Sequence, residues 1–323
     1  MGVHLMRKIL VTGALGQIGS ELTTELRRIY GANNVVASGR RLKEGHEKLI
    51  ESGPFEIVDI TNGKELHEMV KKHNINTIIN LAAILSAVGE KYPEECWNIN
   101  MNGLYNVLEV AREENCMVFT PSSIAAFGPT TPPDNTPQDT IQRPTTMYGV
   151  TKVAGELLCD YYFKKFGVDT RGVRFPGLIS YETLPGGGTT DYAVHIYYDA
   201  LKNKRHTSFI AKGTMMDMMY MPDALDAIIQ LMEADPSKLI HRNAFNVTAM
   251  SFDPEMIAGS IRKFIPEFEL DYDVDPVRQA IADSWPNSLD DSAAREEWGW
   301  DPKYDLDGMT KDMLEKLKIK LGL

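Results

Sequence analysis

Tyr148 and Lys152 are the residues best suited to acid–base chemistry, because they stand four positions apart and a helix would place them on one face. A phenol keeps its proton at neutral pH and is by itself a weak base. An ammonium group one helical turn away favours the phenolate, so the pair could remove a proton from an alcohol. The spacing therefore predicts a general base for chemistry at a hydroxyl group.

The same spacing occurs twice more, so the surrounding sequence must distinguish the functional pair. Ser123 stands 25 positions before Tyr148, just after a predicted strand that ends at Thr120. Its hydroxyl could orient a substrate hydroxyl at the carboxyl end of that strand, where ligands of parallel sheets bind. The residues 25 positions before the tyrosines of the other two pairs are Thr136, in a proline-rich loop, and Val173, in a predicted strand. Neither suits this role. We interpret those pairs as tyrosines near solvated lysines: Tyr161 with Lys165, and Tyr198 with Lys202.

A glycine-rich turn connects the first predicted strand to the first predicted helix, with Gly13, Gly16 and Gly19 at intervals of three residues. In a dinucleotide-binding turn the first glycine permits the tight bend, the second lets backbone amides approach a pyrophosphate, and the third allows close packing of the helix. The helix N-terminus adds partial positive charge. We expect a dinucleotide to bind here, with Gln17 and Ile18 among its contacts.

The end of the second predicted strand lacks the acidic residue that would hold the ribose hydroxyls of such a cofactor. Ser38, Gly39, Arg40 and Arg41 stand there instead. The arginines could accept a 2′-phosphate, which would favour NADP, or they could be solvated loop residues. The sequence thus predicts the class of cofactor and leaves the choice between NAD and NADP open at this position.

Short β-branched segments alternate with amphipathic segments over the first half of the chain, which is typical of a parallel sheet with crossover helices. We predict an α/β fold: a Rossmann-type doubly wound parallel sheet in residues 1–174, with returning segments near 218–248, and a smaller C-terminal substrate lobe in residues 175–323. The predicted strands are 8–12, 35–37, 55–58, 77–81, 117–120, 170–174 and 244–247. The predicted helices are 17–30, 63–73, 94–115, 147–166, 190–203, 222–234 and 306–321.

The composition of the 323 residues is that of a globular protein, with 43% hydrophobic and 24% charged side chains. The net charge of −11 argues against a nucleic-acid partner, which requires a basic face. No apolar run approaches the ~18 residues that span a bilayer, and no signal peptide is recognised, so we expect a cytoplasmic protein without membrane contact. Widely spaced cysteines favour buried thiols and no metal site: Cys96, Cys116 and Cys159.

Two features after residue 175 could shape a pocket for a small molecule. Thr189 and Thr190 follow three glycines and open a predicted helix, so they could bind a carboxylate or serve as a plain helix cap. Trp285 stands in a proline-bounded loop, where it could cover a pocket or fill a core.

Four features together resemble those of the extended short-chain dehydrogenases, which include the UDP-galactose 4-epimerases. They are the glycine turn, Ser123, the tyrosine–lysine pair and residues 100–103. Further stretches, over nearly the whole chain, are similar to the epimerase-like L-threonine 3-dehydrogenases: 85–90, 121–129, 143–152, 176–180, 188–193, 219–223 and 284–286. The resemblance implies NAD-dependent oxidation of the C3 hydroxyl of L-threonine, which yields 2-amino-3-ketobutyrate on the way to glycine.

The resemblance also implies roles for individual positions. Ser123 would orient the substrate hydroxyl, Tyr148 would take its proton, and Lys152 would hold the nicotinamide ribose and favour the phenolate. A homodimer would form through the helices predicted over 94–115 and 147–166. The implied cofactor contacts include Asp59, Ile60, Leu81, Ala82, Ala83, Asn100 and Pro176. The implied amino-acid pocket contains Ser86, Thr189, Thr190 and Trp285 beside Ser123 and Tyr148.

Gly39 departs from this family, which usually carries an acidic residue at that position. The departure leaves hydride chemistry intact but admits NADP beside NAD. Two other functions remain open: a nucleotide-sugar 4-epimerase or dehydratase of the same fold, and a non-catalytic sensor that binds a nicotinamide cofactor and a protein partner. An epimerase would need cations for a second diphosphate, and the chain offers Lys202, Lys204 and Arg205. A sensor would have no need of a base.

Overall fold

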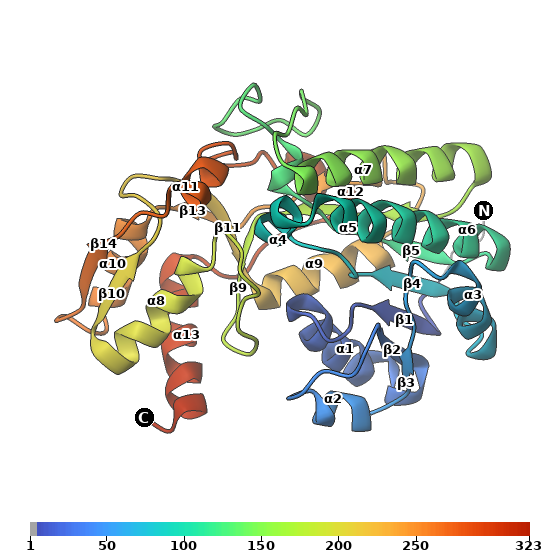
Figure 1. Ribbon diagram of the computed structural model, residues 1–323, viewed down its shortest axis with the longest axis horizontal. Coiled ribbons are helices and arrows are strands. Elements are labelled where there is room, and N and C mark those ends of the chain that lie inside the picture. The colour runs from blue at the N-terminus through green and yellow to red at the C-terminus, as the bar shows by residue number, and fades with distance from the viewer. Residues whose placement is uncertain (1–4) are drawn as a thin grey trace.

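A six-stranded parallel sheet forms the centre of the computed structural model, which describes residues 5–323 (Figure 1). The strand order is β3-β2-β1-β4-β5-β7, so successive connections change direction between β1 and β4. This is the order of a doubly wound sheet, and the predicted fold class is confirmed. The strands are β1 (Ile9–Thr12), β2 (Val35–Gly39), β3 (Phe55–Ile57), β4 (Thr77–Asn80), β5 (Met117–Phe119) and β7 (Thr170–Arg171).

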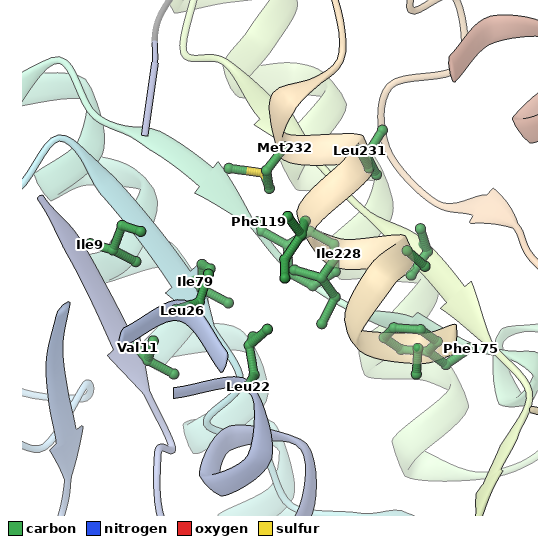
Figure 2. Packing of buried hydrophobic residues seen from close by; sticks show 14 of the residues in the cluster. Ile9, Val11, Leu22, Leu26, Ile79, Phe119, Phe175, Ile228, Leu231 and Met232 are labelled. Carbon is green, nitrogen blue, oxygen red and sulfur yellow. The ribbon is translucent and has the colours of Figure 1, made fainter. Parts of the chain in front are cut away.

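Helices cover both faces of the sheet, because its strands are apolar on both faces. One face carries α1 (Gln17–Tyr30) and α9 (Met221–Glu233), and the other carries α3 (Gly63–Lys72), α6 (Leu104–Glu114) and α7 (Met147–Phe166). Figure 2 shows the first face, where Ile9 and Val11 of β1 lie near Leu22 of α1, and Ile228 of α9 joins the same core. Leu10, between Ile9 and Val11, belongs to the opposite core.

A separate hydrophobic core lies at the other end of the molecule (Figure 1). There α8 (Tyr192–Asn203), α10 (Pro254–Arg262) and α13 (Leu306–Leu321) pack together through buried residues such as Ile196, Ile257 and Met313. The predicted division of the chain near residue 174 stays a prediction. The remaining strands are β6 (Ser122–Ser123), β8 (Val173–Phe175), β9 (Gly177–Ile179), β10 (Arg205–Ser208), β11 (Met216–Tyr220), β12 (Phe245–Asn246), β13 (Met250–Phe252) and β14 (Glu269–Tyr272). The remaining α-helices are α2 (Glu47–Glu51), α4 (Ser86–Lys91), α5 (Pro93–Trp97), α11 (Pro276–Ala282) and α12 (Ser292–Trp298).

The helix predicted over 94–115 is wrong as one continuous element. A π-helical segment, Asn98–Gly103, separates α5 from α6. Within it the buried Asn100 side chain bonds both backbone groups of Ile84, with its oxygen 2.8 Å from the Ile84 nitrogen and its nitrogen 3.1 Å from the Ile84 oxygen. Single π-helical turns inside α-helices are frequent at functional sites. Periodicity alone carries no sign of this long-range contact.

The strand predicted over 170–174 is also wrong as one element, because the chain leaves the central sheet at Gly172. β7 pairs with β5, whereas β8 pairs with β6 and β12 in a small separate sheet. A Cβ atom at Gly172 would lie 2.4 Å from the backbone oxygen of Thr120, so only glycine fits this crossing. The crossing places β6 and β8 beside the carboxyl ends of the central strands.

The three cysteines are buried in separate places and carry free thiols, as predicted: Cys96, Cys116 and Cys159. Burial raises the pKa of the Cys116 thiol to about 12. Over residues 5–323, the structure contains no cluster of three or more His, Cys, Asp or Glu side chains that could hold a metal ion. None of the helices in the same range is long and apolar enough to cross a membrane.

Candidate active site

A cavity of about 250 Å³ lies between the glycine turn, α7 and the segment that precedes α8. It opens at the carboxyl ends of the central strands, where doubly wound sheets bind their ligands. The cavity brings together residues from both halves of the sequence. Those predicted as site residues that line it are Gly13, Gly16, Gln17, Ile18, Gly19, Leu81, Ala83, Ser86, Ser123, Tyr148, Lys152, Pro176, Thr189, Thr190 and Trp285.

The glycine turn is shaped by close backbone contacts. Gly13 has φ +66°, and a Cβ atom there would lie 2.7 Å from the backbone nitrogen of Ala82. A Cβ atom at Gly19 would lie 2.3 Å from the oxygen of Gly13, so the first turn of α1 packs directly on the loop. The side-chain nitrogen of Gln17 is buried there and has no hydrogen-bond partner within the described chain. The turn therefore presents a free donor and a helix N-terminus to the cavity.

A second cavity of about 290 Å³ continues past the glycine turn toward the ends of β2 and β3. Arg40 lies at its edge, 3.6 Å from a carboxylate oxygen of Glu95, and both side chains are about half exposed. An ion pair this exposed contributes little free energy, so the guanidinium remains available to a ligand. The predicted cofactor residues that line this cavity are Gly13, Gly16, Gly39, Arg40, Asp59, Ile60, Leu81, Ala82 and Ala83, and Arg41 and Lys43 join them.

Ser38 and Asn100 stand apart from the two larger cavities. The Ser38 hydroxyl is buried and lies 3.4 Å from the backbone oxygen of Val11. Asn100 borders a small cavity of about 40 Å³ behind Lys152, and its amide also bonds the hydroxyl of Thr151 at 3.1 Å. Asn100 thus connects the segment after β4 to α7. Direct contact of either residue with a cofactor stays a prediction.

The start of α7 fixes the tyrosine–lysine pair. Thr146 caps the helix, because its hydroxyl accepts a hydrogen bond from the Gly149 nitrogen at 3.0 Å. Tyr148 follows in the first turn and is buried with only 9% of its surface exposed. The Lys152 ammonium lies 5.2 Å from the centre of the Tyr148 ring and donates to the backbone oxygen of Pro121 at 2.7 Å. The cation is therefore held beside the phenol, as the spacing predicts.

Ser123 ends the short strand β6 and faces the same cavity as Tyr148. Its hydroxyl oxygen accepts a hydrogen bond from the Ala125 nitrogen at 3.2 Å, which leaves its proton free to be donated. In the ladder, Ser123 lies opposite Phe175 of β8, and the next residue, Pro176, lines the cavity. The backbone of Ser123 is thus held by pairing with β8, and its hydroxyl is held by the hydrogen bond from the Ala125 nitrogen.

The segment before α8 closes the opposite wall. Asp191 accepts hydrogen bonds from the backbone nitrogens of Gly187 at 2.9 Å and Gly188 at 2.6 Å, and burial raises the pKa of its carboxyl. The helix predicted from Thr190 begins instead at Tyr192, because these contacts hold the preceding turn. The Thr189 hydroxyl is buried beside the cavity and has no partner among the described residues. An unpaired buried hydroxyl favours a polar ligand at this wall.

Trp285 lines the cavity and also packs against a small core cluster that contains Ile124, Phe127 and Leu289. Trp285 therefore borders the cavity and packs on a core at the same time, and its contact with a substrate stays a prediction. Residues that sequence analysis missed also line the cavity, and Asp191 is the most polar of them. The position of Asp191 directly after Thr189 and Thr190 is the sequence feature that could have identified it. The other missed residues include Leu85, Ile124, Phe175, Gly177 and Leu178.

Residues 9–247 match the NAD dependent epimerase/dehydratase family. The chain belongs to this family. The resemblance expected from the sequence motifs is thus confirmed, since the family match is accompanied by close similarity to L-threonine 3-dehydrogenases.

Three similar proteins illustrate the relationship. An L-threonine dehydrogenase from Clostridium difficile is 68% identical, with a TM-score of 0.97 and a match that covers 98% of this chain and 99% of that one. The holo form of the GalE-like L-threonine dehydrogenase from Cupriavidus necator is 50% identical, with a TM-score of 0.93 over 96% of this chain and 100% of that one. An uncharacterised epimerase/dehydratase from Staphylococcus saprophyticus is 61% identical over 315 residues, which is 98% of each chain.

Proposed function

We propose that this epimerase/dehydratase-family protein is an L-threonine 3-dehydrogenase that oxidises the C3 hydroxyl of L-threonine to 2-amino-3-ketobutyrate. The observation that carries the proposal is the 68% identity, over nearly the full length of both chains, to a protein described as an L-threonine dehydrogenase. The cavity supports it, because Ser123, Tyr148 and Lys152 line one wall of a space suited to a small substrate.

The residues of the cavity fit a nicotinamide dinucleotide. Gly13 and Gly19 allow the close backbone packing that places the N-terminus of α1 at the cavity, and the buried nitrogen of Gln17 has no partner among the described residues. Arg40, Asp59 and the other residues of the second cavity would hold the adenosine end. When bound, the nicotinamide supplies an acceptor for the hydride that leaves C3 of the substrate. We propose NAD as the cofactor, by similarity to the family described as NAD dependent.

In this proposal Tyr148 removes the proton of the substrate hydroxyl as the general base. Lys152, fixed against the Pro121 oxygen, places a positive charge next to the phenol ring. Ser123 donates its free proton to the substrate oxygen and so holds it within reach of Tyr148. Ser86, Thr189, Thr190 and Trp285 would surround the amino acid, with the Thr189 hydroxyl paired to a polar group of the substrate.

A nucleotide-sugar epimerase or dehydratase is the second candidate, because curated relatives are described as uncharacterised members of the epimerase/dehydratase class. That activity would require cations at a second diphosphate site. Lys202, Lys204 and Arg205 line neither of the two larger cavities. Their positions therefore favour the threonine dehydrogenase. A pure sensor role is disfavoured by the assembled serine, tyrosine and lysine.

Steady-state kinetics test the proposal. We expect reduction of NAD with L-threonine, and a kcat/KM for NAD at least tenfold above that for NADP, which corresponds to about 1.4 kcal/mol. A tenfold preference for NADP would overturn the choice of cofactor. Interconversion of UDP-glucose and UDP-galactose in the presence of NAD, without any turnover of threonine, would overturn the proposed reaction in favour of the second candidate.

A further inference from the structure

Three side chains from three elements meet directly behind the proposed catalytic residues. Glu156 follows Tyr148 and Lys152 at the same four-residue spacing on α7 and is almost fully buried. Its carboxylate accepts a hydrogen bond from the hydroxyl of Ser122 on β6 and forms a two-fold ion pair with Arg174 of β8, at 3.0 and 2.9 Å. None of these three residues was singled out by the sequence motifs as a participant in the site.

The Arg174 side chain is fixed on every side, so it holds the carboxylate in one place. Its remaining nitrogen donates to the backbone oxygen of Gln138 at 2.8 Å and to the Asn246 side chain at 3.0 Å. The central carbon of the guanidinium lies 5.0 Å from the centre of the Phe127 ring. Paired, planar contacts of this kind restrict both distance and orientation. The Glu156 carboxylate is therefore held in one position on α7, unlike an acidic side chain on the surface.

The geometry of β6 connects Glu156 to the Ser123 hydroxyl in the cavity. Successive side chains of a strand point to opposite sides. The Ser122 hydroxyl therefore bonds Glu156, and the next residue, Ser123, points to the other side; both residues border the cavity. The same residues are in register with β8, since Ser122 lies opposite Arg174 and Ser123 opposite Phe175. Any shift of β6 along or away from α7 would move the Ser123 hydroxyl relative to Tyr148.

We propose that Glu156, held between Arg174 and Ser122, is a positioning residue that sets the distance between the Ser123 hydroxyl and the Tyr148 phenol. The inference rests on the proposed dehydrogenase function, because it assigns these two hydroxyls to one substrate oxygen. The hydrogen bond from Ser122 transmits the position of α7 to β6, in addition to the bond from Lys152 to the Pro121 oxygen. A misplacement of about 1 Å can lower a rate by up to about 10²-fold, so one hydrogen bond at this place has a measurable effect.

The test removes the Ser122 hydroxyl and leaves the ion pair intact. Loss of the Glu156 carboxylate would leave the Arg174 charge buried without its ionic partner and would strongly destabilise the fold. Gln142 offers a matched control, because its amide donates to the other oxygen of Glu156 at 2.8 Å but comes from a loop outside β6. Ser122→Ala and Gln142→Ala therefore each remove one hydrogen bond from the same carboxylate.

We expect Ser122→Ala to lower kcat for L-threonine about tenfold, with unchanged KM for NAD, unchanged Kd for NADH, and a loss of thermal stability no larger than in the control. Gln142→Ala should keep kcat within about twofold, and Ser122→Thr, which retains the hydroxyl, should restore kcat. Full kcat in Ser122→Ala, or equal losses in both alanine variants, would overturn the positioning role alone. A wild-type protein that binds NADH but does not oxidise L-threonine would overturn the proposed function and this inference together.

Discussion

Single residues carry the proposed chemistry, and Tyr148→Phe tests the most direct assignment. The variant keeps the ring and its packing but loses the group that takes the proton. We expect kcat to fall by about 10²–10⁴-fold, while the Kd for NADH, measured by fluorescence titration, stays near the wild-type value. Tyr161→Phe is the matched control, because Tyr161 is also four residues before a lysine on α7 but is about half exposed on the outer surface. Near-normal turnover in Tyr148→Phe would rule out the assignment of the base.

Gly39→Asp tests whether the end of β2 faces the adenosine ribose. A Cβ atom at Gly39 meets only ordinary contacts, the nearest being Leu15 Cδ1 at 3.5 Å, so the side chain fits without strain. A carboxylate there would hold ribose hydroxyls and repel a 2′-phosphate. We expect the ratio of kcat/KM for NAD over NADP to rise by about tenfold or more, measured at matched ionic strength. An unchanged ratio would place Gly39 away from the ribose.

The residues that sequence could predict are those whose role depends on local spacing. The glycine turn, Ser123, Tyr148 and Lys152 all follow directly from positions along one strand or helix, and the structure brings them to one cavity. Glu156 and Arg174 could not be found in this way. Their meaning comes from a contact between β6, α7 and β8, and no pattern within any one element predicts it.

At the scale of elements, the segment between β9 and α8 is tied to α1 by a half-buried acid, Glu21. Glu21 accepts a hydrogen bond from the Ser180 hydroxyl at 2.5 Å, and Ser20 lies 3.2 Å from the Thr183 hydroxyl. Burial raises the pKa of the Glu21 carboxyl to about 7. An ordinary glutamate has a pKa of about 4.3, so between these values the folded protein binds a proton that the unfolded chain releases. This contribution to stability is present at low pH and is lost as the pH rises through about 7.

Glu21→Gln removes this titration and keeps a hydrogen-bonding side chain of the same length. We expect the free energy of unfolding of the wild type, relative to the variant, to fall by up to about 3 kcal/mol between pH 4.5 and pH 8. Urea unfolding at a series of pH values measures it. If both proteins show the same pH dependence, Glu21 does not take up a proton on folding.

Element boundaries were predictable where one helix packs on one surface. α1, α7 and α13 begin and end at the residues expected from their apolar periodicity and glycine stops. The π-helical segment at Asn98–Gly103 and the break at Gly172 were not predictable. Each involves a distant part of the chain: the Asn100 side chain bonds the Ile84 backbone, and the backbone of Gly172 passes close to the Thr120 oxygen.

For the whole molecule, we expect the outer surface of α5, α6 and α7 to bind a second copy of the chain. Exposed apolar side chains gather there, among them Trp97, Tyr105, Tyr161 and Leu157, the last with 62% of its surface exposed. Large exposed apolar surfaces of this kind mark protein interfaces. We expect a homodimer in solution, and Leu157→Glu should shift it to monomer in sedimentation experiments because it places a charge in the interface. A wild-type monomer at micromolar concentration would contradict the expected dimer.

The position of Trp285 would let its fluorescence report cofactor binding. Of the four tryptophans, Trp298 and Trp300 lie together in the interior with ring centres 5.7 Å apart, and Trp97 lies on the outer surface. Trp285 lines the cavity proposed for the nicotinamide and the amino acid. Because a reduced nicotinamide absorbs light in the range where indole emits, energy transfer from Trp285 should quench its emission whenever both occupy this cavity. Stopped-flow fluorescence can then follow cofactor arrival and release in real time, without any added dye.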